Sequence, residues 1–502
     1  MPREDRRGDL AEEPHMRNGR SMLQRTLSFS LLVLPVLASA ASGADKIPIT
    51  TSSNEARQLY LQGRDATEKL RAADAYLLFE KAVAEDTKFA LGYYGLANSA
   101  QTNKAFFAAV KQAVALANNV SAGEQLMIRG MQAGVDGDVE GQRRMYTELV
   151  AKYPSDERAL NLLGNFYFGI QQYPTAIEYL NKATALDPSF TAPYNQLGYA
   201  YRFEGRYPEA EATFKKYIEL LPTDPNPYDS YAEFLMKVGR FDESIASYRK
   251  ALEVDPTFVA SLIGIANDQM FQGQGDEARK TLRQMSSIAR NDGERRVALF
   301  WTGQSYILEG RYAEAVRTVG DERAIAVKSG DISSQAADAV FIGNIQLAAG
   351  NTDAAAASFA EAVALMGKAA VPVEIKEANK RNSLFNNARV ALKRGDIKTA
   401  KAQAALFQKQ VEVKKVPFEV WQVHELLGMV AIAQRQYDVA LQELAKGTEQ
   451  NPRVLYLTAL ALQGKGDTHR ARAAAQAVAG FNALHPNYAY VRPAAQKMLA
   501  GS

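Results

Sequence analysis

Two consecutive stretches of the sequence decide the fold, namely ERALNLLGNFYFGIQQYPTAIEYLNKATALDP at residues 157–188 and TAPYNQLGYAYRFEGRYPEAEATFKKYIELLP at residues 191–222. The second stretch repeats the first at a spacing of 34 residues, and further copies of the pattern begin at Gly123, Pro225 and Val259. Spacings of three, four and seven residues place the large apolar side chains on one stripe of a helix. The period therefore predicts two short helices per repeat, each with one face to bury.

Small residues and prolines recur at fixed places in each copy. Gly164 and Gly198 fall among the large residues, where they let the two helices of a pair approach closely. Gly205 falls in the turn between the helices, where glycine suits a left-handed cap. Pro208 stands where the second helix should start and needs no N–H there, and Pro222 follows its expected end. One such pair cannot bury its apolar stripe alone, so the pairs are predicted to stack.

Large residues at block positions 4, 7, 11 and 24, small ones at 8 and 20, and proline at 32 resemble the tetratricopeptide repeat. The resemblance implies an all-α fold, a right-handed superhelical solenoid of about twelve antiparallel helix pairs. Residues 55–100 and 121–129 also resemble repeat arrays of bacterial signalling proteins, here without the effector domain that accompanies such arrays. We expect irregular connections between pairs at 286–293, 321–334 and 367–377.

The N-terminal composition predicts export. Residues 27–37 read LSFSLLVLPVL, follow several arginines and precede Ala38-Ser39-Ala40, which is the basic, apolar and small-residue order of a secretory signal. We expect an exported protein, periplasmic or secreted, with no integral membrane span after signal cleavage. The predicted domains are a leader and secretory signal peptide at 1–40, a linker at 41–54, an N-terminal array with the most regular repeats at 55–292, and a degenerate C-terminal array at 293–502.

Composition excludes several classes of function. The formal net charge is +3, so no global positive field attracts nucleic acid, and the absence of Cys excludes thiol catalysis. Gly273-Gln274-Gly275 matches a dinucleotide fingerprint only loosely, because no strand precedes it. His424 lacks a second His at the metalloprotease spacing. We therefore predict no catalytic residue, no cofactor and no metal site, and a protein that is not an enzyme.

The resemblance also implies where a ligand binds. In this family the first helix of each pair lines the concave face, and block positions 2, 5, 9, 12 and 13 point into it. Asparagine suits an extended peptide at such positions, because one side-chain amide can satisfy both a backbone N–H and a C=O. Arg158 occupies a position 2. The predicted groove residues are Asn161, Asn165, Phe168, Asn195, Tyr199, Arg202, Phe203, Asp229, Glu233, Met236, Asn267 and Met270.

These features predict a non-catalytic scaffold or adaptor of the bacterial cell envelope that binds a protein or peptide partner on the concave face. Two alternatives stay open. One is a structural envelope subunit that assembles with itself, because the last helix, 487–502, is a poor polar cap for a solenoid end. The other is an envelope hydrolase with a site in the degenerate C-terminal half.

One segment stands out by its charge. Residues 374–415 carry eleven Lys and Arg against four Asp and Glu, in a chain that is otherwise close to neutral. Such a segment is either the solvated outer face of a helix pair or a contact with an acidic protein or anionic membrane surface. The sequence leaves both interpretations open.

Overall fold

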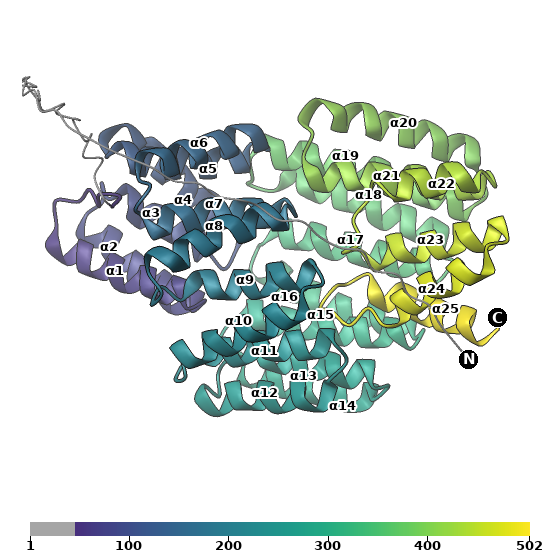
Figure 1. The fold of residues 1–502 in the computed structure, drawn as a ribbon. Coiled ribbons are helices and arrows are strands. Elements are labelled where there is room, and N and C mark those ends of the chain that lie inside the picture. Colours follow the sequence, from purple (N-terminus) through teal and green to yellow (C-terminus); the bar gives the residue numbers. More distant parts are fainter. Residues whose placement is uncertain (1–45, 502) are drawn as a thin grey trace, which may run out of the picture. The chain divides into compact units, whose positions relative to one another are not determined.

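The computed structural model describes residues 46–501, and the regular structure of this range is helical, without a β-strand. Its 25 α-helices pack as consecutive pairs, from α1 with α2 to α23 with α24, and α25 follows the last pair (Figure 1). The prediction of an all-α array of about twelve helix pairs is confirmed. The predicted leader and signal peptide lie outside the described residues.

The first seven pairs contain mostly helices of 12 to 15 residues. Their bounds are α1 Asn54–Glu68, α2 Ala72–Glu85, α3 Ala90–Asn98, α4 Asn103–Leu116, α5 Ala122–Val135, α6 Val139–Lys152, α7 Glu157–Gly169, α8 Tyr173–Leu186, α9 Ala192–Phe203, α10 Tyr207–Leu220, α11 Pro225–Lys237, α12 Phe241–Val254, α13 Ala260–Phe271 and α14 Gly275–Ile288, with a short 3-10 helix at Ala117–Asn119.

The remaining helices are α15 Asp292–Leu308, α16 Tyr312–Lys328, α17 Ile332–Ala348, α18 Thr352–Lys368, α19 Val373–Lys393, α20 Ile397–Lys414, α21 Pro417–Ala433, α22 Tyr437–Leu444, α23 Pro452–Lys465, α24 Thr468–Ala479 and α25 Tyr488–Ala500. From α15 to α18 each helix has 17 residues, and α19 has 21. These longer helices explain why the 34-residue period fades in the second half. The expected irregular connection at 321–334 is wrong over most of its length, because α16 continues to Lys328.

The predicted start and stop signals act as expected in the regular repeats. Proline occupies the first turn of α8 and of α10, and the Asp156 carboxylate caps α7 by accepting from the backbone N–H groups of Arg158 and Ala159 at 2.9 and 3.0 Å. Gly205 has φ +71°, a left-handed conformation that glycine adopts without strain. Gly198 is buried where α9 crosses α10, and an added Cβ would lie 2.5 Å from the Phe214 ring. The close helix crossing therefore requires glycine.

The C-terminal segment folds back onto the array. Helix α25 packs against α15, α23 and α24 (Figure 1), and Tyr488 at its start is fully buried. Phe481 and Tyr488 belong to the largest hydrophobic cluster, which also contains residues of α11 to α16. Contacts between distant repeats recur elsewhere, since Arg71 pairs with Asp224 at 3.0 Å and Thr448 donates to Gln171 at 2.6 Å. None of the helices in residues 46–501 has both the length and the apolar character needed to cross a bilayer.

Candidate functional site

The first helices of successive pairs form the inner side of the array. Helix α7 contacts α9, α9 contacts α11 and α11 contacts α13, and the same relation holds from α1 through α3 to α5. A cavity of about 340 Å³ opens among α1, α3, α5, α7 and α9. This volume lies in the range of sites that bind small molecules or single peptide side chains. The cavity is the candidate functional site.

Three predicted asparagines lie together in this cavity. Asn161 and Asn165 stand one turn apart on α7, and Asn195 stands on α9. The side-chain oxygen of each is buried and has no hydrogen-bond partner within the described residues. A buried polar atom without a partner costs free energy, so three of them at one cavity indicate a surface that a ligand completes. An amide there can accept from a backbone N–H and donate to a C=O of a bound peptide.

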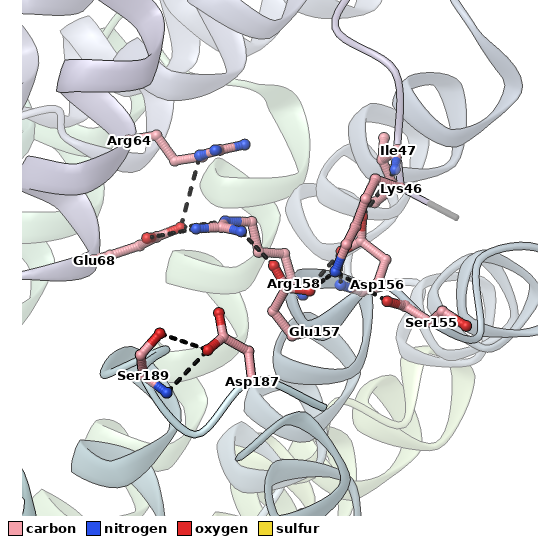
Figure 2. Close-up of polar contacts among 11 residues, drawn as sticks. Lys46, Ile47, Arg64, Glu68, Ser155, Asp156, Glu157, Arg158, Asp187 and Ser189 are labelled. Carbon is pink, nitrogen blue, oxygen red and sulfur yellow. Dashed lines mark hydrogen bonds and ion pairs between the residues drawn. The ribbon is translucent and has the colours of Figure 1, made fainter. Parts of the chain in front are cut away.

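Arg64, Glu68 and Arg158 line the cavity and are joined by ion pairs (Figure 2). Arg158 on α7 donates from Nε and Nη2 to the two carboxylate oxygens of Glu68 on α1, at 2.7 and 3.1 Å. Its Nη1 also pairs with Glu157 at 2.5 Å. Burial alone would lower the pKa of Arg158, but the hydrogen bonds and charge of Glu68 raise it. Arg64 lies 3.8 Å from Glu68. This part of the lining is therefore polar but nearly neutral.

A segment without regular secondary structure, residues 46–53, forms part of the same lining. Lys46 pairs with Glu157 and donates to the Ser155 carbonyl at 3.0 Å, and the Ile47 N–H donates to the Asp156 carboxylate at 2.8 Å (Figure 2). Further along, the Thr50 N–H donates to Glu124 at 2.8 Å. Burial would raise the pKa of Glu157, but the hydrogen bond from Lys46 holds it below its ordinary value. The array thus binds a non-helical stretch of its own chain through side-chain carboxylates.

Apolar and aromatic groups complete the cavity. Tyr60 on α1, Tyr94 on α3 and Leu162 on α7 line it, and Phe190 lies under Arg158 with 4.8 Å between ring centre and guanidinium carbon. Burial raises the pKa of Tyr60 to about 12, so its hydroxyl stays protonated at neutral pH. Large rings beside a few amides suit one apolar side chain of a ligand whose backbone the amides bind.

A second group of predicted residues does not line this cavity, and its members form hydrogen bonds and ion pairs with neighbouring side chains. The Tyr199 hydroxyl donates to Glu233 at 2.7 Å, and Arg202 pairs with the same carboxylate at 3.0 Å. Asp229 accepts from the Ser261 hydroxyl at 2.7 Å. Burial, with a contribution from Glu233, raises the pKa of Asp229 to about 7. These four side chains therefore already have partners, and they form a polar connection between α9, α11 and α13.

The predicted Phe168 and Phe203 lie near the turns of their helix pairs. Phe203 stacks on Tyr173 with 4.9 Å between ring centres, and Phe168 contacts the same ring edge-on at 5.5 Å. Both phenylalanines remain half-buried. They act as packing residues of an aromatic cluster, away from the three asparagines.

The last three predicted residues are covered by the chain itself. Met236, Asn267 and Met270 are buried against the C-terminal segment. The Tyr488 hydroxyl donates to the Asn267 side-chain oxygen at 3.1 Å and lies 3.5 Å from the Met270 sulfur. The prediction that these residues line an open groove is wrong, because α25 occupies that space. Repeat spacing gives no signal for such back-folding.

The basic segment 374–415 is partly neutralised within the fold. Arg381 pairs with Glu419 at 2.9 Å, Arg394 pairs with Asp353, and Lys380 pairs with Glu377 at 2.7 Å. His485 lines a second cavity beside Arg389. Within residues 46–501 no group of three His, Asp or Glu side chains is arranged to hold a metal ion.

Comparison with known proteins agrees with this geometry. Models of the tetratricopeptide repeat match residues 137–191, 192–224 and 235–300. Stacked helix pairs with a ligand-sized cavity on their inner side define a repeat scaffold of the kind that binds protein or peptide partners. Residues 137–224 and 235–300 of the chain therefore consist of tetratricopeptide repeats. No curated protein matches the sequence.

Several solved structures are similar to parts of the chain. A MamA protein is 25% identical over 32% of this chain and 88% of its own, with a TM-score of 0.28. A thermophilic tetratricopeptide repeat protein of Thermus thermophilus is 21% identical over 42% of this chain and 98% of its own, with a TM-score of 0.29. A tetratricopeptide repeat protein from Parabacteroides merdae is 15% identical over 52% of this chain and 99% of its own, with a TM-score of 0.36.

Proposed function

We propose that the protein is a non-catalytic scaffold of the bacterial cell envelope that binds an extended segment of a protein partner on the inner side of α1 to α9. The observation that carries the proposal is the set of unpartnered side-chain oxygens of Asn161, Asn165 and Asn195 around one cavity. An extended peptide presents a regular row of N–H and C=O groups, which matches amides spaced along two neighbouring helices. The apolar rings beside them take up one side chain.

The N-terminal segment supports the same mode of binding. Its non-helical backbone donates N–H groups from Ile47 and Thr50 to carboxylates of the array. A partner peptide would use amides where this segment uses carboxylates. Export to the periplasm or beyond rests on the basic, apolar and small-residue order before residue 41.

The structure removes the argument for self-assembly through the C-terminal end. The expectation of an uncapped last helix depended on its apolar residues, and Tyr488 and Val491 are buried within the array. A hydrolase in the second half has no grouped acid, base and nucleophile among the residues described to support it.

The proposal is tested by selecting peptides from a random library displayed on phage against the immobilised protein. We expect a consensus with one large apolar or aromatic residue, because the cavity holds one such side chain. Peptides with this consensus should bind at the asparagine cavity, so the Asn165→Ala, Asn195→Ala variant should not select that consensus. Selection of the same consensus by that variant would refute the proposed site.

A further inference from the structure

A second cavity, of about 370 Å³, lies among α17, α19, α21, α23 and the turn before α25. Arg389 on α19 reaches into it, in a part of the chain that repeat spacing marks as degenerate. This cavity is separate from the cavity of the three asparagines, and the inference drawn from it does not depend on the proposed function. Its volume is sufficient for a small organic ligand.

Arg389 has no carboxylate partner within residues 46–501. Its Nη1 donates to the side-chain oxygens of Asn344 and Asn386, at 2.7 and 3.1 Å. Its Nε and Nη2 have no hydrogen-bond partner among residues 46–501, and no Asp or Glu of that range lies within ion-pair distance. The neighbouring Arg381 and Arg394 on the same basic segment each pair with an acid. Arg389 therefore presents a free edge of its guanidinium to the cavity.

The surroundings leave the cavity with one positive charge. Arg453 is neutralised by Glu425, with which it pairs. Burial, with Arg453, lowers the pKa of His485 to about 4, so the imidazole is neutral at pH 7. Burial, with Arg453, also lowers the pKa of Arg389 to about 9, which still leaves it charged. Arg389 is half-buried, and a cation held partly away from water without a counter-ion is costly, so an entering anion removes that cost.

The remaining lining indicates what the anion is attached to. Phe385 lies beside the Arg389 guanidinium, 5.5 Å from ring centre to its central carbon, and Trp421 and Phe418 are further aromatic groups of the lining. The side chains of Asn382 and Gln422 supply amide groups. One guanidinium edge matches the two oxygens of a single carboxylate, and the rings match an apolar or aromatic body.

We infer that this cavity is a binding site for a monoanionic carboxylate that carries an apolar or aromatic group, with Arg389 as its anchor. The carboxylate comes either from a small organic acid or from the C-terminus of a peptide. Both sources share the same pairing with the free guanidinium edge.

The protein offers its own reporter for the test. It has two tryptophans, and Trp421 lines the cavity whereas Trp301 is buried elsewhere. Full-length protein labelled with 5-fluorotryptophan gives two fluorine signals, which the Trp421→Phe variant assigns. The probes are 3-phenylpropionate, its uncharged amide, and N-acetylphenylalanine.

We expect 3-phenylpropionate to shift the Trp421 signal saturably and its amide to bind at least tenfold more weakly. The Arg389→Gln variant should bind the acid at least tenfold more weakly than the wild type, and Arg389→Lys should keep part of the affinity. The control Lys393→Gln, at an exposed position on the same helix, should bind the acid as the wild type does. Tighter binding of N-acetylphenylalanine than of 3-phenylpropionate indicates a peptide C-terminus, and the reverse order indicates a small acid.

Two results would overturn the inference. One is equal binding of acid and amide. The other is an Arg389→Gln variant that melts as the wild type does and still binds the acid within threefold. Melting gives an independent check, because loss of an uncompensated charge should leave the ligand-free melting temperature equal or higher. A clear fall would show that Arg389 is a structural residue, and Arg389→Lys then tests binding in a folded protein.

Discussion

Arg158 reaches across the inner side of the array and forms a two-pronged ion pair with Glu68, at 2.7 and 3.1 Å, although 90 residues separate them in the sequence. The pair (Figure 2) joins α7 to α1, and both of its residues line the asparagine cavity. Glu68 and Glu157 neutralise the positive charge of Arg158. The guanidinium therefore holds α1 and α7 together beside the cavity and does not attract an anion.

Glu68→Gln should lower the free energy of unfolding by about 1 kcal/mol, since the pair is half-buried and its geometry is bidentate. Urea unfolding at low and high salt measures the effect, which should shrink with salt. Glu178→Gln removes an exposed pair with Lys182 and serves as the control. A cost for Glu68→Gln no larger than the control's would show that the pair does not stabilise the fold.

Gly198→Ala should destabilise the protein by about 1 to 3 kcal/mol, because the added Cβ meets the Phe214 ring at 2.5 Å. Gly320→Ala is the matched control, since Gly320 is an exposed residue inside α16 with no atom near an added Cβ. That control should stabilise the protein by up to about 1 kcal/mol through helix propensity. Chemical denaturation measures both, and changes of the same sign would contradict this account of the helix crossing.

Asp229→Asn should raise the melting temperature at pH 8 and leave it nearly unchanged at pH 4. Burial, with Glu233, raises the pKa of Asp229 to about 7, whereas an unfolded chain loses this proton near pH 4. Between about pH 4 and 7 the folded state holds the extra proton, so this group's contribution to stability falls as pH rises.

Calorimetric melting across this pH range tests the Asp229 prediction. Asp242→Asn, which removes an exposed carboxylate on the neighbouring α12, controls for the loss of one negative charge. An Asp229→Asn variant whose melting temperature follows the wild-type pH profile would show that Asp229 does not titrate in this window.

Much of the fold could be predicted because its signals are local. Gly205 and Pro208 mark the turn and the second helix within a few residues of each other, and the structure has both where expected. The longer helices of the second half could not be placed, because an added helical turn changes the period without changing the type of residue. Residues 321–328 read as a connection and belong to α16.

The site could be predicted only in part, for a related reason. Block position brings Asn161, Asn165 and Asn195 to one face, since this follows from helix periodicity. Tyr60, across the cavity, lies in repeats whose register is irregular. The cover that Tyr488 places over Asn267 depends on tertiary packing between residues 221 apart, which no local pattern encodes.

The affinity of a library-selected peptide for the Asn165→Ala, Asn195→Ala double variant, measured by calorimetry, tests the central claim most directly. Neither side-chain oxygen has a hydrogen-bond partner in the part of the chain that the structure describes, so their loss should leave the melting temperature unchanged or slightly higher. We predict an affinity at least tenfold weaker, about 1.4 kcal/mol. Asn181→Ala, an exposed amide on the outer helix α8, should bind as the wild type does. Affinity of the double variant within twofold of the wild type would contradict the proposed groove.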